Sequence, residues 1–124
     1  MKPYALLTTV LALGIVLIRC SSLPRRSEQC IRERLLRETP QGSTYSAVLS
    51  YAKKQGWPVT EHSRGYETRK SGRSPATVVG KRAIEAYLGS YQGLPWHVDV
   101  DVYWAFDEHD KLIDVFVDKQ ADAL

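Results

Sequence analysis

The carboxylates that the sequence offers for chemistry gather near its C-terminal end. They alternate with apolar residues, at Asp99, Asp101, Asp114 and Asp118. This spacing is typical of side chains on one face of a strand pair. Carboxylate oxygens bind calcium, but calcium takes about six to eight ligands in a wrapped geometry that a flat strand face does not supply. We therefore expect no metal and no cofactor, and interpret these aspartates as a solvated acidic face or as contacts for a partner.

Residues for acid–base or nucleophilic catalysis are dispersed. His62, His97 and His109 fall in segments expected to be a loop, a strand start and a turn. No serine or cysteine lies in a nucleophile-elbow pattern, and no glycine-rich phosphate loop joins a strand to a helix. Cys20 and Cys30 lack the paired spacing of a zinc site. The pattern indicates no catalytic residues and hence no enzyme; a small enzyme using His97 and the aspartates is the weaker alternative.

Residues 57–80 combine positive charge with glycine and proline, which favours a flexible basic loop, with a short strand at Val59 or at 77–79 as an alternative. The candidate partner-binding residues in this loop are Arg64, Tyr66, Arg69, Lys70 and Arg73. Their charge fits an acidic protein or anionic lipid head groups. It also fits a phosphate backbone, but an exported protein would not meet nucleic acid, so we expect no nucleic-acid partner.

The charge of the 124-residue chain is divided between its two halves. Residues 19–82 contain 14 basic and 5 acidic residues, whereas residues 83–124 contain 2 basic and 9 acidic ones. Two surfaces that attract each other within one fold would explain this split, as would a basic patch kept for a partner. The length leaves room for one domain.

Two strands near the C-terminus are predicted from alternation. Residues 98–106 place valines, Trp104 and Phe106 on one face, and residues 111–119 repeat the pattern with Ile113, Val115 and Val117. A two-residue turn at 109–110 would place Phe106 opposite Ile113, Trp104 opposite Val115 and Val102 opposite Val117. Asp101 would then lie opposite Asp118. Residues 82–91 are read as a third strand, with a helix as the alternative.

Two short helices precede the strands. Ser27 is expected to cap a helix over residues 28–38, which ends before Pro40. Ser43 or Thr44 caps a second helix that ends at Gly56. The predicted fold class is therefore α+β, with an N-terminal hydrophobic signal or anchor helix followed by two short helices packed on a three-stranded antiparallel sheet.

The N-terminal residues have the pattern of a targeting segment. Lys2 precedes an apolar run at residues 5–18, whose length is typical of a secretory signal and short for a membrane span. Three fates stay open for residues 1–22: lipidation of Cys20 after cleavage, ordinary cleavage near Ser22, or retention as an anchor. Residues 23–124 would form the single folded domain.

Motifs in the folded part resemble the BamE/SmpA/OmlA family of small bacterial envelope lipoproteins. They are G-x-T-x-x-x-V at 42–48, G-x-P at 56–58, and W-x-F-D at 104–107 followed by Leu112. A closer resemblance is to uncharacterised bacterial proteins that carry AYLG, LP and LID, here at 86–89, 94–95 and 112–114. The resemblance implies the fold of β-lactamase-inhibitor protein, with two helices on a three-stranded sheet.

The function expected from these features is that of a non-enzymatic bacterial envelope protein, located in the periplasm or anchored to a membrane facing it. It would bind another envelope protein as an accessory module of a complex, through the sheet or the basic loop. The alternative is a periplasmic inhibitor or immunity-type protein that blocks an enzyme, a use that the resembling fold also serves.

Overall fold

The computed structural model describes residues 23–68, 77–93 and 95–123. The predictions for the signal or anchor segment, Cys20, Arg69, Lys70 and Arg73 lie outside these residues. The described elements are η1 (Leu23–Arg25), α2 (Glu28–Glu38), α3 (Tyr45–Lys54), β1 (Val59–His62), β2 (Tyr66–Thr68), β3 (Thr77–Val79), β4 (Arg82–Gly93), β5 (Trp96–Phe106) and β6 (Leu112–Ala123).

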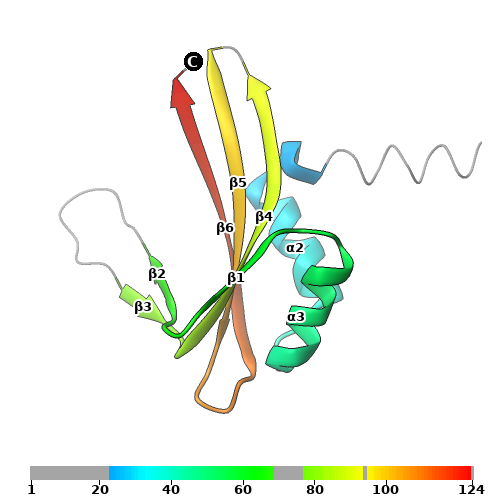
Figure 1. Ribbon diagram of the computed structural model, residues 1–124, viewed down its shortest axis with the longest axis vertical. Coiled ribbons are helices and arrows are strands. Elements are labelled where there is room, and N and C mark those ends of the chain that lie inside the picture. Colours follow the sequence, from blue (N-terminus) through cyan, green and yellow to red (C-terminus); the bar gives the residue numbers. More distant parts are fainter. Residues whose placement is uncertain (1–22, 69–76, 94, 124) are drawn as a thin grey trace, which may run out of the picture.

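The helices begin where the sequence predicts. The Ser27 side chain accepts a hydrogen bond from the Cys30 N–H, and Thr44 accepts one from Ala47 N–H, each at 3.2 Å. Each cap satisfies one amide that the first helical turn leaves without a partner. Both helices lie on the same side of the sheet, and the small hairpin of β2 and β3 lies on the other side (Figure 1).

The main sheet is antiparallel, with four strands in the order β1-β4-β5-β6. The α+β class with two helices is thus confirmed, whereas the expected number of three strands is wrong. The additional strand, β1, lies in the segment assigned to a flexible loop. Its four residues carry Glu61 and His62 and show little alternation, so its strand conformation comes from pairing with β4. Residues 82–91 are strand, not helix.

Residues 66–68 and 77–79 form a second sheet of two strands. The assignment to a loop is therefore wrong for 66–68, whereas the strand named as the alternative at 77–79 is confirmed. The two sheets share one register. His62 pairs with Ala83 and Tyr66 with Val79, so three residues intervene on each strand. β1 to β4 therefore make one long hairpin that bends at 63–65 and 80–82, and its outer part folds over the main sheet.

Glycine permits this bend. A Cβ atom on Gly65 would lie 2.2 Å from the Val79 carbonyl oxygen, and one on Gly80 would lie 2.6 Å from the Phe106 carbonyl oxygen. Real Cβ contacts are not this short, so any larger residue would push the strands apart. Gly80 also has φ +81°, which disfavours other residues.

The register of β5 and β6 agrees with the prediction over most of its length. Trp104 pairs with Val115 and Val102 with Val117. The two-residue turn is wrong: the Asp107 N–H bonds to the Lys111 carbonyl, and three residues follow Asp107 before Lys111, with Asp110 at φ 57°. The longer turn moves Leu112 opposite Phe106, and a bulge at Ile113 restores the pairing. Leu112 is therefore buried, and Ile113, expected in the core, is 37% exposed.

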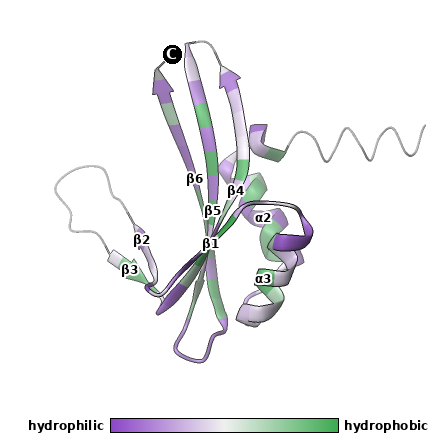
Figure 2. Ribbon diagram, in the orientation of Figure 1, coloured by the Kyte–Doolittle hydropathy of each residue, from purple (hydrophilic) through white to green (hydrophobic). Residues whose placement is uncertain are grey.

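The core lies between the helices and the sheet. It contains the fully buried side chains of Ile31 and Leu35 from α2, Val48 from α3, and Trp104 from β5. The Trp104 indole N–H donates to the Thr39 hydroxyl at 3.1 Å, and that hydroxyl donates to the Leu35 carbonyl at 2.6 Å. Hydrophobic stretches of α2 and α3 lie beside hydrophobic stretches of the sheet strands (Figure 2). We call the side of the sheet facing the helices the inner face, and the opposite side the outer face.

Candidate functional site

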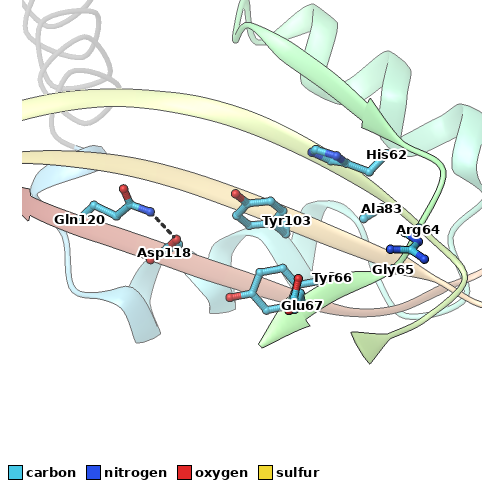
Figure 3. A pocket seen from close by; sticks show the side chains of 9 residues that line it. All are labelled: His62, Arg64, Gly65, Tyr66, Glu67, Ala83, Tyr103, Asp118 and Gln120. Atoms are coloured by element: carbon cyan, nitrogen blue, oxygen red, sulfur yellow. Dashed lines mark hydrogen bonds between the residues drawn. The ribbon is translucent and has the colours of Figure 1, made fainter. Parts of the chain in front are cut away.

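The outer face carries a groove of about 650 Å³ between the main sheet and the β2–β3 hairpin. Figure 3 shows its walls, with Tyr66 and Glu67 of β2 on one side and the strands of the main sheet on the other. The residues that line it are His62, Arg64, Gly65, Tyr66, Glu67, Ala83, Tyr103, Asp118 and Gln120. The groove exists because the bent hairpin stands over the sheet, and this fold-over has no local sequence signature.

Aromatic stacking holds the hairpin on the outer face. The Tyr66 ring stacks on Phe116 with a centroid distance of 4.4 Å and contacts Tyr103 at 4.7 Å. Tyr66 was predicted to contact a partner from a flexible loop. It is instead a half-buried residue of β2 that forms part of the groove wall. Aromatic pairs at these distances contribute about 0.5–1.5 kcal/mol beyond the burial of their area.

Glu85 of β4 organises the polar groups beside the groove. One of its carboxylate oxygens accepts the Tyr103 hydroxyl hydrogen bond at 3.0 Å, and the other lies 2.7 Å from His62 Nε2. Burial, followed by the hydrogen bond to Glu85, raises the pKa of Tyr103 well above its usual range. The phenol therefore stays protonated as a donor. Glu85 was not among the residues predicted for the site. Strand alternation at 82–91 nevertheless places its side chain on the face of the sheet away from that of its neighbour Ile84, which is the outer face.

Asp101 is a half-buried carboxylate on the outer face of the sheet. It pairs across the strands with Asp118 on one side and Tyr87 on the other. Within residues 23–68, 77–93 and 95–123, no hydrogen bond or ion pair reaches the Asp101 carboxylate. Burial raises its pKa above the ordinary value, and the charges of Glu85, Asp118 and Asp99 raise it further. The opposition of Asp101 and Asp118 predicted from the sequence is therefore present, and no basic side chain among the described residues forms an ion pair with either carboxylate.

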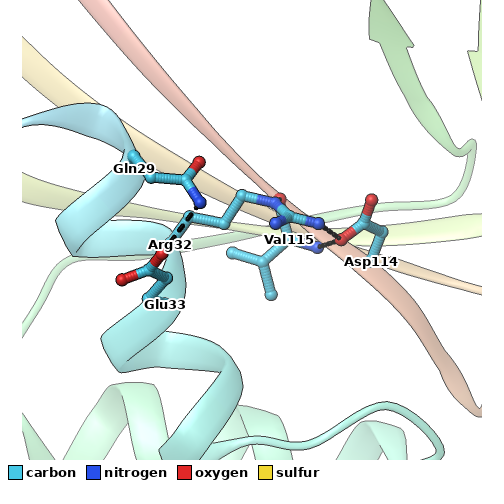
Figure 4. A network of polar contacts seen from close by, with 5 residues as sticks. All are labelled: Gln29, Arg32, Glu33, Asp114 and Val115. Carbon is cyan, nitrogen blue, oxygen red and sulfur yellow. Dashed lines mark hydrogen bonds and ion pairs between the residues drawn. The ribbon is translucent and has the colours of Figure 1, made fainter.

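The other two aspartates have partners. Asp99 Oδ1 accepts the Tyr87 hydroxyl hydrogen bond at 2.8 Å and lies 3.3 Å from His97 Nε2. Asp114, expected beside the others on the outer face, instead binds Arg32 of α2, whose Nη2 lies 2.6 Å from Asp114 Oδ1 (Figure 4).

Arg32 reaches Asp114 at the free edge of β6. Its Nε donates to the Val115 carbonyl at 3.1 Å, and Gln29 bonds Glu33 nearby on the helix. The β6 bulge beside Ile113 turns Asp114 toward this edge, which alternation alone did not predict. Asp114 is therefore a structural contact of α2 and does not join the groove.

Of the predicted basic residues, Arg64 lines the groove at the hairpin bend, whereas Arg69, Lys70 and Arg73 lie outside the described residues. In the described part of the chain, no group of three or more His, Cys, Asp or Glu side chains is arranged to hold a metal ion. The described lining also includes no serine or cysteine. What the arrangement can do chemically is to hold a cationic or hydrogen-bonding group between carboxylates and aromatic rings.

The described residues form a two-layer α+β fold with a groove lined by polar and aromatic side chains. No family model, curated protein or solved structure matches the chain. Across the described ranges, none of the helices has the length and apolar character needed to cross a membrane.

Proposed function

We propose that this chain is a non-enzymatic protein of the bacterial cell envelope that binds another envelope protein through the outer-face groove. The observation that carries the proposal is the Asp101–Asp118 pair, which the described part of the fold leaves without a positive partner at the edge of an aromatic groove. Opposed like charges destabilise a sheet, and a cationic ligand that contacts both carboxylates would remove that cost.

The partner chemistry follows from the lining. Carboxylates of Asp118 and Glu67 and the rings of Tyr66 and Tyr103 surround the groove. Arginine suits such a surface, because its guanidinium forms two hydrogen bonds to a carboxylate and stacks on aromatic rings. A volume of about 650 Å³ lies within the usual size of ligand sites, roughly 300–1,000 Å³. We therefore infer a partner that inserts one or two cationic side chains of an exposed segment.

The envelope location rests on the apolar run at 5–18 and on the resemblance to BamE/SmpA/OmlA proteins. Either lipidation of Cys20 or retention of the run would hold the domain at a membrane that faces the periplasm. Intact mass of the protein from membranes distinguishes diacylglycerol on Cys20, cleavage near Ser22 and an uncleaved chain.

Affinity purification from detergent-solubilised envelopes tests the binding proposal. The Asp101→Asn/Asp118→Asn double variant is compared with wild type and with Glu108→Gln, a change of charge at the exposed β5–β6 turn. We expect a stable envelope partner to be retained by wild type and Glu108→Gln and lost by the double variant. Equal retention by all three would refute binding through the groove. Capture of a single hydrolase or toxin, with loss of its activity, would favour the inhibitor or immunity-type alternative.

A further inference from the structure

The inner face of the sheet continues past the helices at one end. β4, β5 and β6 extend beyond α2 and α3, and η1 lies beside β4 at this end (Figure 1). We call residues 89–93, 96–100 and 119–123 the distal ribbon. On its inner face the pairing brings Tyr91 beside Val98, and Val98 beside Ala121. Trp96, near the tip, is 49% exposed.

Positive charge accompanies these apolar groups. Lys119 Nζ lies 5.0 Å from the centre of the Tyr91 ring, and the Arg25 guanidinium carbon lies 5.5 Å from it. Arg25 and Arg26 are both exposed. The outer face of the same ribbon has the opposite character, because its alternate positions carry Asp99 and Asp122. The ribbon is thus cationic and aromatic on one face and acidic on the other.

The chain that leads to the N-terminus is fastened to this cationic face. Leu23 is buried, and Pro24 lies beside Gly89 of β4, where an added Cβ would make an ordinary contact with the proline ring at 3.5 Å. Lys119 Nζ donates to the Arg26 carbonyl at 2.5 Å and to the Tyr91 hydroxyl at 3.2 Å. Residues 23–26 are therefore part of the folded domain and do not act as a flexible linker to residues 1–22.

When the apolar run is retained or Cys20 is lipidated, this attachment limits how far the domain can lie from the membrane. Only residues 19–22 separate Leu23 from the apolar run, and a chain reaches at most about 3.6 Å per residue, or roughly 18 Å over five steps. A lipid on Cys20 would shorten the tether further. Trp96 lies about four strand residues beyond the η1 contact at Gly89, or roughly 13 Å. The tether and the distance from Gly89 to Trp96 are thus of similar length, so the tip of the distal ribbon can touch the bilayer surface.

We propose that the inner face of the distal ribbon lies against an anionic bilayer surface, with Trp96 at the depth of the head groups and with Arg25, Arg26 and Lys119 facing anionic lipids. Tryptophan favours the membrane interface, and basic residues next to a membrane segment are attracted to anionic lipids. The contact turns the acidic outer face and its groove away from the lipid. This inference rests on the envelope placement in the proposed function and adds the surface and the lipid class.

The test uses the full chain in vesicles of phosphatidylcholine alone or mixed equally with phosphatidylglycerol, each containing a nitroxide-labelled lipid that quenches tryptophan at head-group depth. Trp57, which precedes β1 and whose ring lies 5.9 Å from that of Tyr51 on α3, is the control. We expect quenching in anionic vesicles that Trp96→Phe removes and Trp57→Phe does not. Each basic residue near a surface contributes about a fivefold change in equilibrium, so Arg25→Gln/Arg26→Gln should lower the ratio of docked to undocked domain about 25-fold. Arg64→Gln, at the outer-face groove, is the matched control and should leave quenching unchanged.

The other possible outcomes distinguish failure of the lipid contact from failure of the proposed function. Equal quenching of wild type and Trp96→Phe, or quenching that ignores phosphatidylglycerol, overturns the contact while the groove proposal stands. A full chain that stays out of both vesicle types and out of cell membranes overturns the contact and the membrane anchoring together, and recovery in the cytosolic rather than the periplasmic fraction overturns the envelope placement as well. Partner loss in the Asp101→Asn/Asp118→Asn variant, measured separately, reports on the groove alone.

Discussion

Replacing Asp101 by asparagine should stabilise the fold at neutral pH. The carboxylate is half-buried, lies opposite Asp118 and has no bonded partner among the described residues. Its pKa is raised, by burial first and then by Glu85, Asp118 and Asp99. A carboxyl whose pKa is higher in the folded than in the unfolded state binds protons more tightly when folded, so stability falls as pH rises through the interval between the two pKa values. Asparagine removes this loss while keeping the shape of the side chain.

The magnitude follows from the cross-strand geometry. A directly opposed like-charge pair on a sheet costs roughly 0.2–1 kcal/mol. Partial solvent access screens the more distant carboxylates, so we expect a gain of about 0.5–1 kcal/mol for Asp101→Asn. For a domain of about 100 residues, 1 kcal/mol corresponds to a Tm change of about 4–8 °C. The gain should appear above pH ~4, the usual pKa region of aspartate, and vanish at pH ~3 where both states are protonated.

Thermal unfolding of the full chain in non-ionic detergent, followed by circular dichroism at both pH values, measures the effect. Asp99→Asn is the control, because Asp99 accepts the Tyr87 hydroxyl hydrogen bond and should gain nothing on neutralisation. An unchanged or lowered Tm for Asp101→Asn at pH 7 would refute the reasoning, and so would an equal gain at pH 3. The same variant should bind the partner less well, so that stability and binding change in opposite directions.

Three further changes probe other parts of the molecule. Thr39→Val removes the acceptor of the buried Trp104 indole N–H and the donor to the Leu35 carbonyl, which should cost about 1–3 kcal/mol in urea unfolding; Ser43→Ala, at an exposed hydroxyl, is its control. Gly65→Ala would place a Cβ 2.2 Å from the Val79 carbonyl and should release Tyr66 from Phe116, seen as loss of nuclear Overhauser contacts between the two rings while those between Trp104 and Val115 persist. The Asp107 carboxylate accepts the Lys111 and His109 amides, which hold its pKa below the ordinary value. The stability that this carboxylate contributes is present above its pKa in the unfolded chain and is lost as pH falls through its pKa in the folded chain. Asp107→Asn should therefore make the free energy of unfolding depend less on pH below pH ~4.

The predictable part of the fold is the part in which burial imposes a simple period. Val102 and Trp104 alternate with outward residues, and this alternation was sufficient to pair them correctly with Val117 and Val115. The alternation gave the wrong position for Ile113. The three-residue turn shifts the pairing by one residue and the bulge shifts it back, so the predicted pairs beyond the bulge are correct and Ile113 no longer points into the core. The strand β1, which begins at Val59, was only the alternative to a loop, because its conformation comes from the ladder with β4 and not from its own sequence pattern.

The candidate site divides in the same way. Asp99, Asp101 and Asp118 reach the outer face by strand alternation alone, as predicted. Their neighbours Glu85, His62 and Tyr103 come from three strands, and only the sheet order places them together. The groove wall required knowledge that the hairpin bends back at Gly65 and Gly80, which depends on tertiary approach and has no local pattern.

The unbroken register of the bent hairpin bears on how the molecule assembles. Once β1 and β4 have zipped together, β2 and β3 can continue the same ladder without closing a new loop, so their association adds little entropic cost. Beyond the bend, the β2–β3 hairpin, or flap, contacts the main sheet through the Tyr66 ring, which stacks on Tyr103 and Phe116. We therefore expect amides 66–68 and 77–79 to exchange with deuterium through small local openings, well before those of the central ladder. A partner that wedges the flap open or clamps it shut would shift that exchange without melting the domain.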